Sequence, residues 1–105
     1  MSATLCLTLL LSQTLEEEVI DILLLHYPEQ GSRPFITTTV DGHGTAGDMS
    51  SANEQVRGRT ARTRIDILVE AEHATSLINS LRDKMPGAVI DWWLTPVIDS
   101  GTLGL

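Results

Sequence analysis

The chain has 105 residues, 42% of them hydrophobic, which fits one compact domain with a single core. Seven Lys and Arg residues face 14 Asp and Glu residues, and the formal net charge of −7 excludes general nucleic-acid binding, because the phosphate backbone would repel the protein. The single cysteine, Cys6, excludes an intramolecular disulfide framework, so a reducing cytoplasmic setting is expected.

The first predicted element is a strand over residues 4–11. Leu5, Leu7 and Leu9 alternate with other side chains, the period of two that is typical of a strand with one buried face. The same run does not resemble a signal peptide, because no Lys or Arg precedes it and Glu16 follows closely. No other apolar run approaches the ~20 residues of a transmembrane helix, so no direct membrane insertion is expected.

Two amphipathic helices are predicted. Thr14 and Glu17 form a capping box at the start of the first helix, and Pro28 ends it. The second helix ends at Pro86 and Gly87. The inward stripes are Leu15, Val19, Ile22, Leu23 and His26 in the first helix, and Ala74, Leu77, Ile78, Leu81 and Met85 in the second.

Three further strands are predicted over residues 35–41, 65–69 and 89–98. The complete order is strand, helix, strand, strand, helix, strand, which is the ferredoxin-like βαββαβ arrangement of the α+β class. We therefore expect a single domain over residues 1–105, with a four-stranded antiparallel sheet and two helices on one of its faces.

Both faces of this sheet are predicted to be apolar. The helix-covered face is expected to hold Leu5, Leu7, Leu9, Ile36, Val40, Ile65, Ile67, Ile90, Trp92 and Leu94. The opposite face is expected to hold Thr8, Leu10, Phe35, Leu68, Val89, Trp93 and Val97. Since the opposite face is too apolar for contact with water, an oligomer closed by sheet faces is expected, with Trp93 at its interface.

The connection between the second and third strands, residues 42–61, is far longer than a usual hairpin loop, and such loops tend to be functional. Four of the seven cationic residues lie at its end or just beyond it: Arg57, Arg59, Arg62 and Arg64. The planar guanidinium of arginine binds phosphate or carboxylate through two hydrogen bonds, so the cluster predicts an anion site. The alternative is a solvated cluster, part of which forms an ion pair with Asp66 on the same side of the strand.

His43 stands between two glycines with Asp41 and Asp48 nearby, which raises the hypothesis of a divalent metal site. The alternative is an exposed loop histidine. Cys6 has no base placed beside it, and no G-x-S-x-G or other catalytic signature occurs, so no enzymatic activity is expected.

The strand order, the long connection and the segment Pro96-Val97-Ile98-Asp99-Ser100-Gly101 resemble the PII-like superfamily of ferredoxin-like homotrimeric signalling proteins. More narrowly, Gly42-His43-Gly44, Glu54-Gln55-Val56-Arg57-Gly58-Arg59 and residues 93–101 are similar to a small bacterial PII-like family that is often encoded beside heavy-metal efflux pumps.

The resemblance implies a cytoplasmic regulatory homotrimer whose T-loop, residues 42–62, docks on a membrane transporter or another partner. An anionic effector, such as an adenine nucleotide, would bind in clefts between subunits. The ligand-binding residues would be Arg57, Gly58, Arg59, Arg62, Arg64 and Gly87. The alternative function is a metal-binding protein linked to copper or zinc efflux or tolerance, which would use His43 and Asp41.

Overall fold

The computed structural model describes residues 3–26, 35–44 and 59–104, with the backbone alone at residues 59 and 60. Its elements are β1 (Thr4–Ser12), the short 3-10 helix η1 (Gln13–Leu15), α1 (Glu16–His26), β2 (Phe35–His43), β3 (Arg59–Glu70), α3 (Ala71–Lys84) and β4 (Asp91–Pro96). The predicted order of strands and helices is therefore confirmed.

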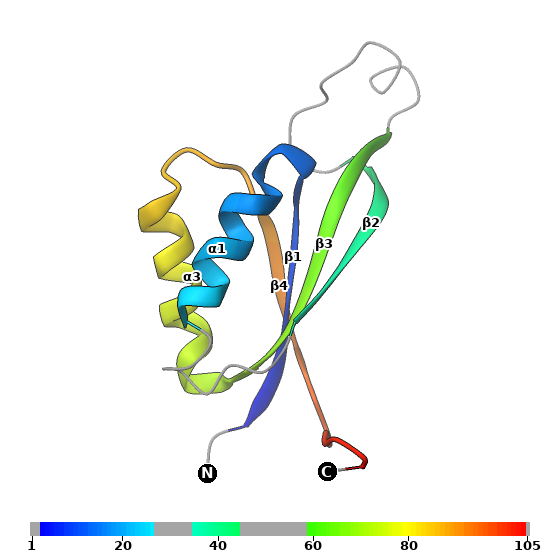
Figure 1. The fold of residues 1–105 in the computed structure, drawn as a ribbon, viewed down its shortest axis with the longest axis vertical. Helices are drawn as coiled ribbons and strands as arrows, with labels where there is room; N and C mark the ends of the chain where they lie inside the picture. Colours follow the sequence, from blue (N-terminus) through cyan, green and yellow to red (C-terminus); the bar gives the residue numbers. More distant parts are fainter. Residues whose placement is uncertain (1–2, 27–34, 45–58, 105) are drawn as a thin grey trace.

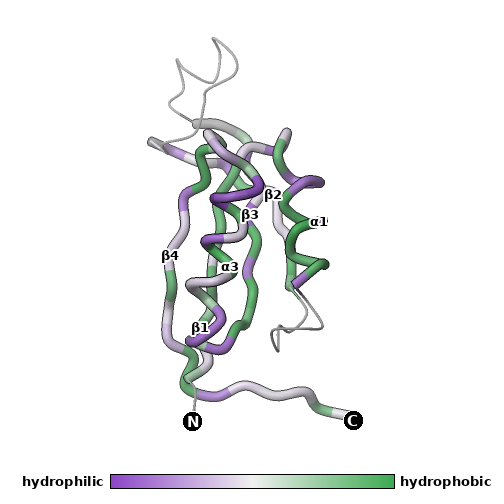
Figure 2. The backbone as a smooth tube through the Cα atoms, turned by 90° about the vertical axis from the view of Figure 1, so that its left-hand side faces the viewer, coloured by the Kyte–Doolittle hydropathy of each residue, from purple (hydrophilic) through white to green (hydrophobic). Residues whose placement is uncertain are grey.

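The four strands form one antiparallel sheet in the order β2-β3-β1-β4. Both helices lie on the same face of this sheet, and no helix of the described residues lies on the other face (Figure 1). Seen from the helix side, α3 lies nearer the β4 edge and α1 nearer the β2 edge (Figure 2). The predicted layer arrangement is confirmed, and it leaves one sheet face open in the single chain.

The hydrophobic core fills the space between the sheet and the helices. The predicted helix stripes supply it as expected, apart from His26, which is only partly buried at the end of α1. Leu7 pairs with Ile67 and Leu9 pairs with Ile65. Because cross-strand partners share a sheet face, these leucines of β1 and isoleucines of β3 face the helices together. The buried apolar residues are Leu7, Leu9, Leu11, Val19, Ile22, Leu23, Ile65, Ile67, Val69, Ala74, Leu77, Leu81 and Met85.

The first helix begins differently from the predicted capping box. Ser12 precedes η1, and its hydroxyl accepts a hydrogen bond from the Thr14 amide at 3.4 Å. The Thr14 hydroxyl lies 3.0 Å from the same Ser12 oxygen, so Ser12 rather than Thr14 caps this turn. The difference arises because one 3-10 turn is inserted before α1, which begins at Glu16.

A partly buried hydrogen bond connects the start of α1 to the sheet. The Thr63 hydroxyl, which is fully buried in β3, donates to Oε1 of Glu16 at 3.0 Å. Glu16 also belongs to an acidic first turn, where negative charge complements the helix dipole. The contact therefore couples the entry of the helix to the centre of the sheet.

Replacing Glu16 by alanine is expected to lower the free energy of unfolding by about 1–3 kcal/mol, because the Thr63 hydroxyl then stays buried without its acceptor. Glu18→Ala is the matched control, because Glu18 is an exposed acidic residue of the same first turn. Urea unfolding checks both variants, and equal losses would contradict a specific role for the Thr63 contact.

The predicted faces of β2 are wrong. Phe35 pairs with Ile67, whereas Ile36 pairs with Asp66. Phe35 therefore packs against the core, and Ile36 lies on the helix-free face with 63% of its surface exposed. Val40 shares that face with Ile36 because the two residues are four apart in the same strand. A one-residue change of register reverses every side chain, and β2 is an edge strand whose Ile, Thr and Val pattern does not fix its orientation.

The expectation that Trp92 belongs to the core is also wrong. Trp92 pairs with Leu9 and so lies on the helix-covered face, but 47% of its surface is exposed. The strand is an edge strand and is shorter than predicted, ending at Pro96. Beyond it, the chain leads away from the sheet (Figure 2). Trp92 lines an unfilled pocket beneath the end of α3, so the indole is not packed against the helix.

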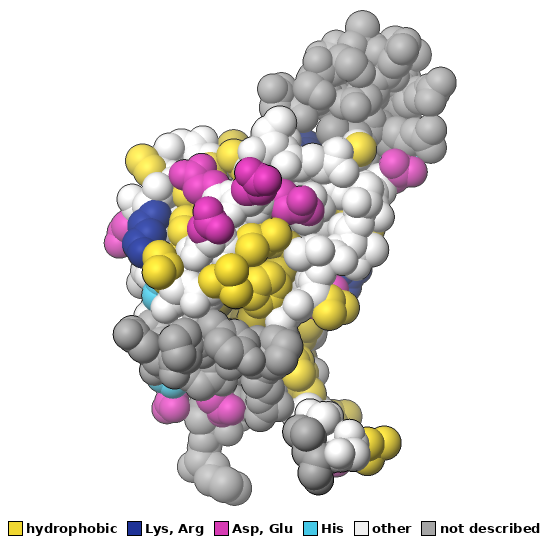
Figure 3. Space-filling model, viewed as in Figure 1, with side chains coloured by type: hydrophobic (Ala, Val, Ile, Leu, Met, Phe, Trp, Pro, Cys, Tyr) yellow, Lys and Arg dark blue, Asp and Glu magenta, His cyan; other side chains and the backbone are white. Residues whose placement is uncertain are grey.

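The outer surface of α1 is divided between charge and apolar side chains. Figure 3 shows acidic side chains gathered above a hydrophobic patch on this side of the molecule. The first turn holds Glu16, Glu17 and Glu18, and the last turns expose Leu24 and Leu25. Neither this helix nor any other in the described part of the chain is long and apolar enough to cross a membrane.

Candidate functional site

A polar group crosses the centre of the helix-free face. Asp66 of β3 lies opposite Thr8 of β1, and Thr8 in turn lies opposite Trp93 of β4. Thr8 is 2% exposed, and its hydroxyl donates to Oδ1 of Asp66 at 2.7 Å. Nε of Arg64 donates to Oδ2 of the same carboxylate at 3.1 Å. The predicted ion pair with Asp66 is thus confirmed for Arg64.

Cys6 borders this group. Its sulfur lies 4.0 Å from Oδ1 of Asp66 and 3.9 Å from the Thr8 hydroxyl, at the limit of hydrogen bonding to sulfur. The neighbouring carboxylate oxygen is a hydrogen-bond acceptor for the thiol. These contacts describe a structural thiol at the edge of the polar group.

The structure brings together two of the predicted anion-binding arginines. Arg62 and Arg64 are two apart in β3 and therefore share the helix-free face. Arg62 is 1% exposed, whereas the Arg64 side chain is 45% exposed beside its ion pair with Asp66. Of this pair, Arg64 is the residue that a solute can reach from one chain alone.

The other predicted residues are distributed around the same end of the fold. Arg59 begins β3 and its backbone pairs with His43, while Arg57 and Gly58 lie outside the described residues. Because β2 extends to His43, part of the predicted T-loop is regular strand. The connection between the two strands is therefore shorter than the segment of residues 42–62 expected from the sequence.

Asp41 and His43 both lie at the end of β2 and are exposed. Two residues apart in a strand, they share one face. Over residues 3–26, 35–44 and 59–104, no group of three or more His, Cys, Asp and Glu side chains is arranged to hold a metal ion. Asp48 lies outside these ranges, so the predicted metal site stays a prediction.

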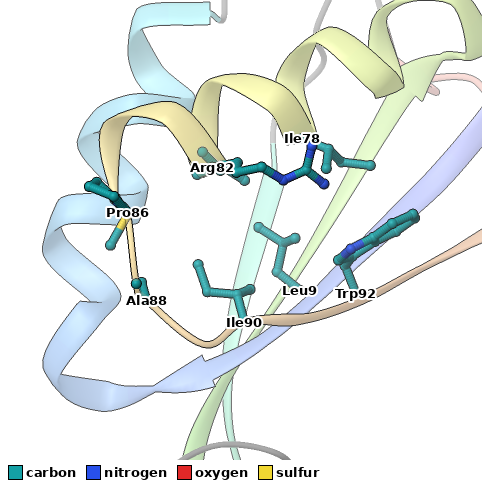
Figure 4. Close-up of a pocket in the computed structure, with 10 residues that line it drawn as sticks. Leu9, Ile78, Arg82, Pro86, Ala88, Ile90 and Trp92 are labelled. Carbon is teal, nitrogen blue, oxygen red and sulfur yellow. The ribbon is translucent and has the colours of Figure 1, made fainter.

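Gly87 lies in the turn that joins α3 to β4, at the opposite edge of the sheet from β2. Its φ of +84° is a left-handed conformation that favours glycine over residues with a Cβ atom. The turn borders a pocket of about 340 Å³ beneath the end of α3 (Figure 4). Sequence reasoning missed this pocket, because its walls come from β1, α3 and β4 and only the packing of the elements leaves it open.

The apolar part of the helix-free face surrounds the polar group. Leu10 pairs with Arg64, Leu68 pairs with Cys6, and Trp93 pairs with Thr8. The three apolar side chains therefore lie on the helix-free face. Ile36 and Trp93 are 63% and 40% exposed. An apolar face of this kind is unusual on a solitary chain and is typical of an interface.

These features define a class of fold: a ferredoxin-like βαββαβ domain with an apolar sheet face opposite the helices and arginines along β3. Several solved structures share this fold with the chain at low sequence identity. The chain belongs to the DUF3240 family, described as a protein of unknown function, whose sequence profile matches residues 1–104.

Three solved structures illustrate the likeness. A DUF3240 family protein from Shewanella baltica is 17% identical with a TM-score of 0.75, and the match covers 98% of this chain and 99% of that chain. Arabidopsis thaliana PII bound to citrate is 16% identical with a TM-score of 0.65, covering 91% of this chain and 78% of that chain.

The third is CPII, a nitrogen regulatory PII-like protein from Thiomonas intermedia K12 bound to ADP, AMP and bicarbonate. It is 14% identical with a TM-score of 0.64, and the match covers 90% of this chain and 91% of that chain. No protein among the curated sequences matches this chain at a significant level. The predicted resemblance to PII-like proteins is confirmed at the level of the fold.

Proposed function

We propose that this protein is a PII-like regulatory trimer that binds a small anionic effector between its subunits and acts by binding rather than by catalysis. The observation that carries the proposal is the exposed Arg64 beside Arg62 on an open apolar sheet face, within a fold shared with PII-like signalling proteins. The A. thaliana structure holds citrate, and the T. intermedia structure holds ADP, AMP and bicarbonate. All four ligands are anions.

Assembly through the helix-free face supports an anion site between subunits. It would bury the apolar surface around Trp93 and would bring the β2–β3 end of one chain close to a neighbouring chain. In the proposed trimer, the arginine cluster of one subunit and the Gly87 turn of the next enclose the effector. Guanidinium groups bind phosphate and carboxylate oxygens with paired, charge-assisted hydrogen bonds, so the proposed ligand is a nucleotide or a smaller polycarboxylate or carbonate anion.

The segment between β2 and β3 would transmit the signal in this proposal. It follows His43 directly and ends at Arg59, so a ligand on the arginine cluster contacts the base of the segment. A transporter or another partner protein would bind the segment in one ligand state and not in the other.

Calorimetric titration with ADP, AMP, citrate and bicarbonate tests the effector site. At least one of these anions is expected to bind wild type, and Arg64→Gln is expected to weaken it about tenfold or more, because a charge-assisted hydrogen bond is lost. The double variant Arg57→Ala, Arg59→Ala tests the rest of the cluster in the same way. Lys84→Gln is the control, since Lys84 is an exposed cation of α3, which lies on the helix side of the sheet (Figure 1).

Binding that survives in both cluster variants would place the effector elsewhere and overturn the proposed site. Absence of binding by all four anions to wild type would overturn the proposed effector class. Thermal unfolding with each anion gives an independent readout, because a ligand that binds the native state raises the melting temperature.

A further inference from the structure

The pocket beneath the end of α3 is built from an apolar interior and one cationic side chain. Its base consists of Leu9 and Leu81, which are 1% and 5% exposed. Trp92 of β4 forms one wall, and the turn after α3 closes the other end (Figure 4). Its volume of about 340 Å³ lies in the range of small-molecule sites in proteins.

The pocket exists because the chain does not pass directly from α3 into β4. The Met85 amide bonds to the Leu81 carbonyl at 3.0 Å, and the Ala88 amide bonds to the Met85 carbonyl at 3.1 Å. These bonds, with Gly87 in its left-handed conformation, turn the chain away from the helix axis before β4 begins. The space left under the last helical turn is therefore held open by ordered backbone.

Arg82 is the one charged residue among those that line the pocket. Figure 4 shows its side chain lying over the cavity, with the guanidinium on the side of Ile78 and Trp92. Nη1 donates to Oδ1 of Asn79 at 3.0 Å, which orients the group while the guanidinium keeps further N–H donors. The indole of Trp92 contributes an additional donor, and its nitrogen lies on the side of the ring nearer to Leu9 in Figure 4.

We propose that this pocket is a second ligand site, which takes a small carboxylate with an apolar body. The apolar part would replace water against Leu9, Leu81 and Trp92, and the carboxylate would accept hydrogen bonds from Arg82 at the mouth. An amine would place its charge beside the guanidinium and is excluded by repulsion. The site lies within one chain and shares only the Gly87 turn with the proposed effector site, so it does not require assembly.

Octanoate is the probe, and the ¹H–¹⁵N spectrum of the full chain reports its position. The two tryptophan side chains are adjacent in sequence but lie on opposite faces of the sheet, and only Trp92 lines the pocket. Titration with octanoate is expected to shift the Trp92 indole N–H signal and to leave that of Trp93 in place. The signals are assigned with Trp92→Phe.

Arg82→Gln is expected to weaken octanoate binding about tenfold or more, because the charge-assisted contact to the carboxylate is lost. Lys84→Gln is the matched control, since Lys84 is an exposed cation in the same last turn that does not line the pocket. Arg64→Gln is expected to keep octanoate binding, which separates this site from the arginine cluster. Ala88→Leu is expected to abolish binding by filling the pocket.

Three results would each overturn the proposal. The first is no shift of the Trp92 signal at millimolar octanoate. The second is equal binding of octanoate and octylamine, which would show that Arg82 does not select a carboxylate. The third is evidence that octanoate binds outside the pocket. Either an equal response of both indoles or an unchanged affinity in both Arg82→Gln and Ala88→Leu would supply it.

Discussion

Replacing Leu7 by alanine is expected to lower the free energy of unfolding by about 2–5 kcal/mol, the range for a large-to-small change in a packed core. Leu7 is fully buried at the centre of the sheet, between Ile67 on β3 and Leu94 on β4. Truncation therefore leaves a cavity that strands on both sides cannot easily fill. Equilibrium urea unfolding at fixed protein concentration measures the loss.

Leu24→Ala is the matched control for this prediction. Leu24 lies on α1 with 54% of its surface exposed, so the same chemical change is expected to cost less than about 1 kcal/mol. A loss in Leu24→Ala as large as that in Leu7→Ala would show that the exposed leucines of α1 are covered in the assembled protein. A negligible loss in Leu7→Ala would contradict the position of the core.

Trp93→Asp is expected to dissociate the proposed trimer to monomers at micromolar concentration. Trp93 lies on the helix-free face opposite Thr8, where assembly would remove it from water. A carboxylate without a partner in such a contact costs roughly 3–5 kcal/mol per site, and the cost recurs in each subunit. Light scattering or sedimentation gives the molecular mass directly.

Trp92→Asp is the control for the dissociation. Trp92 is the adjacent residue, has a similar exposure and lies on the helix-covered face. Its replacement is expected to disturb the pocket and leave the molecular mass at the wild-type value. If Trp93→Asp keeps the wild-type mass, or if wild type is itself a monomer, the helix-free face is not the subunit interface.

The amphipathic patterns of the sequence are sufficient to predict the order of the strands and helices. The alternating leucines of β1 and the stripe from Ala74 to Met85 predict elements that the structure confirms, because the apolar face of each must turn toward a common core. The pairing of Arg64 with Asp66 also followed from parity, since residues two apart in a strand lie on the same side.

Edge strands were less predictable. In β2, alternating Ile, Thr and Val residues are compatible with either face, and pairing with β3 placed Phe35 rather than Ile36 toward the core. In β4, the composition suggests burial of Trp92, but the residue lines the pocket under the end of α3 and is 47% exposed.

The order of the elements and the inward faces of the helices follow from patterns among residues near one another in the chain, and the acidic charge follows from composition. Only the folded chain shows that Thr8 of β1 lies beside Asp66 and Arg64 of β3, and that α3 leaves a pocket under Arg82. These features depend on the register between strands distant in sequence and on the distance at which a helix packs over a sheet edge. Local patterns constrain neither quantity, so the candidate sites became visible only in the assembled fold.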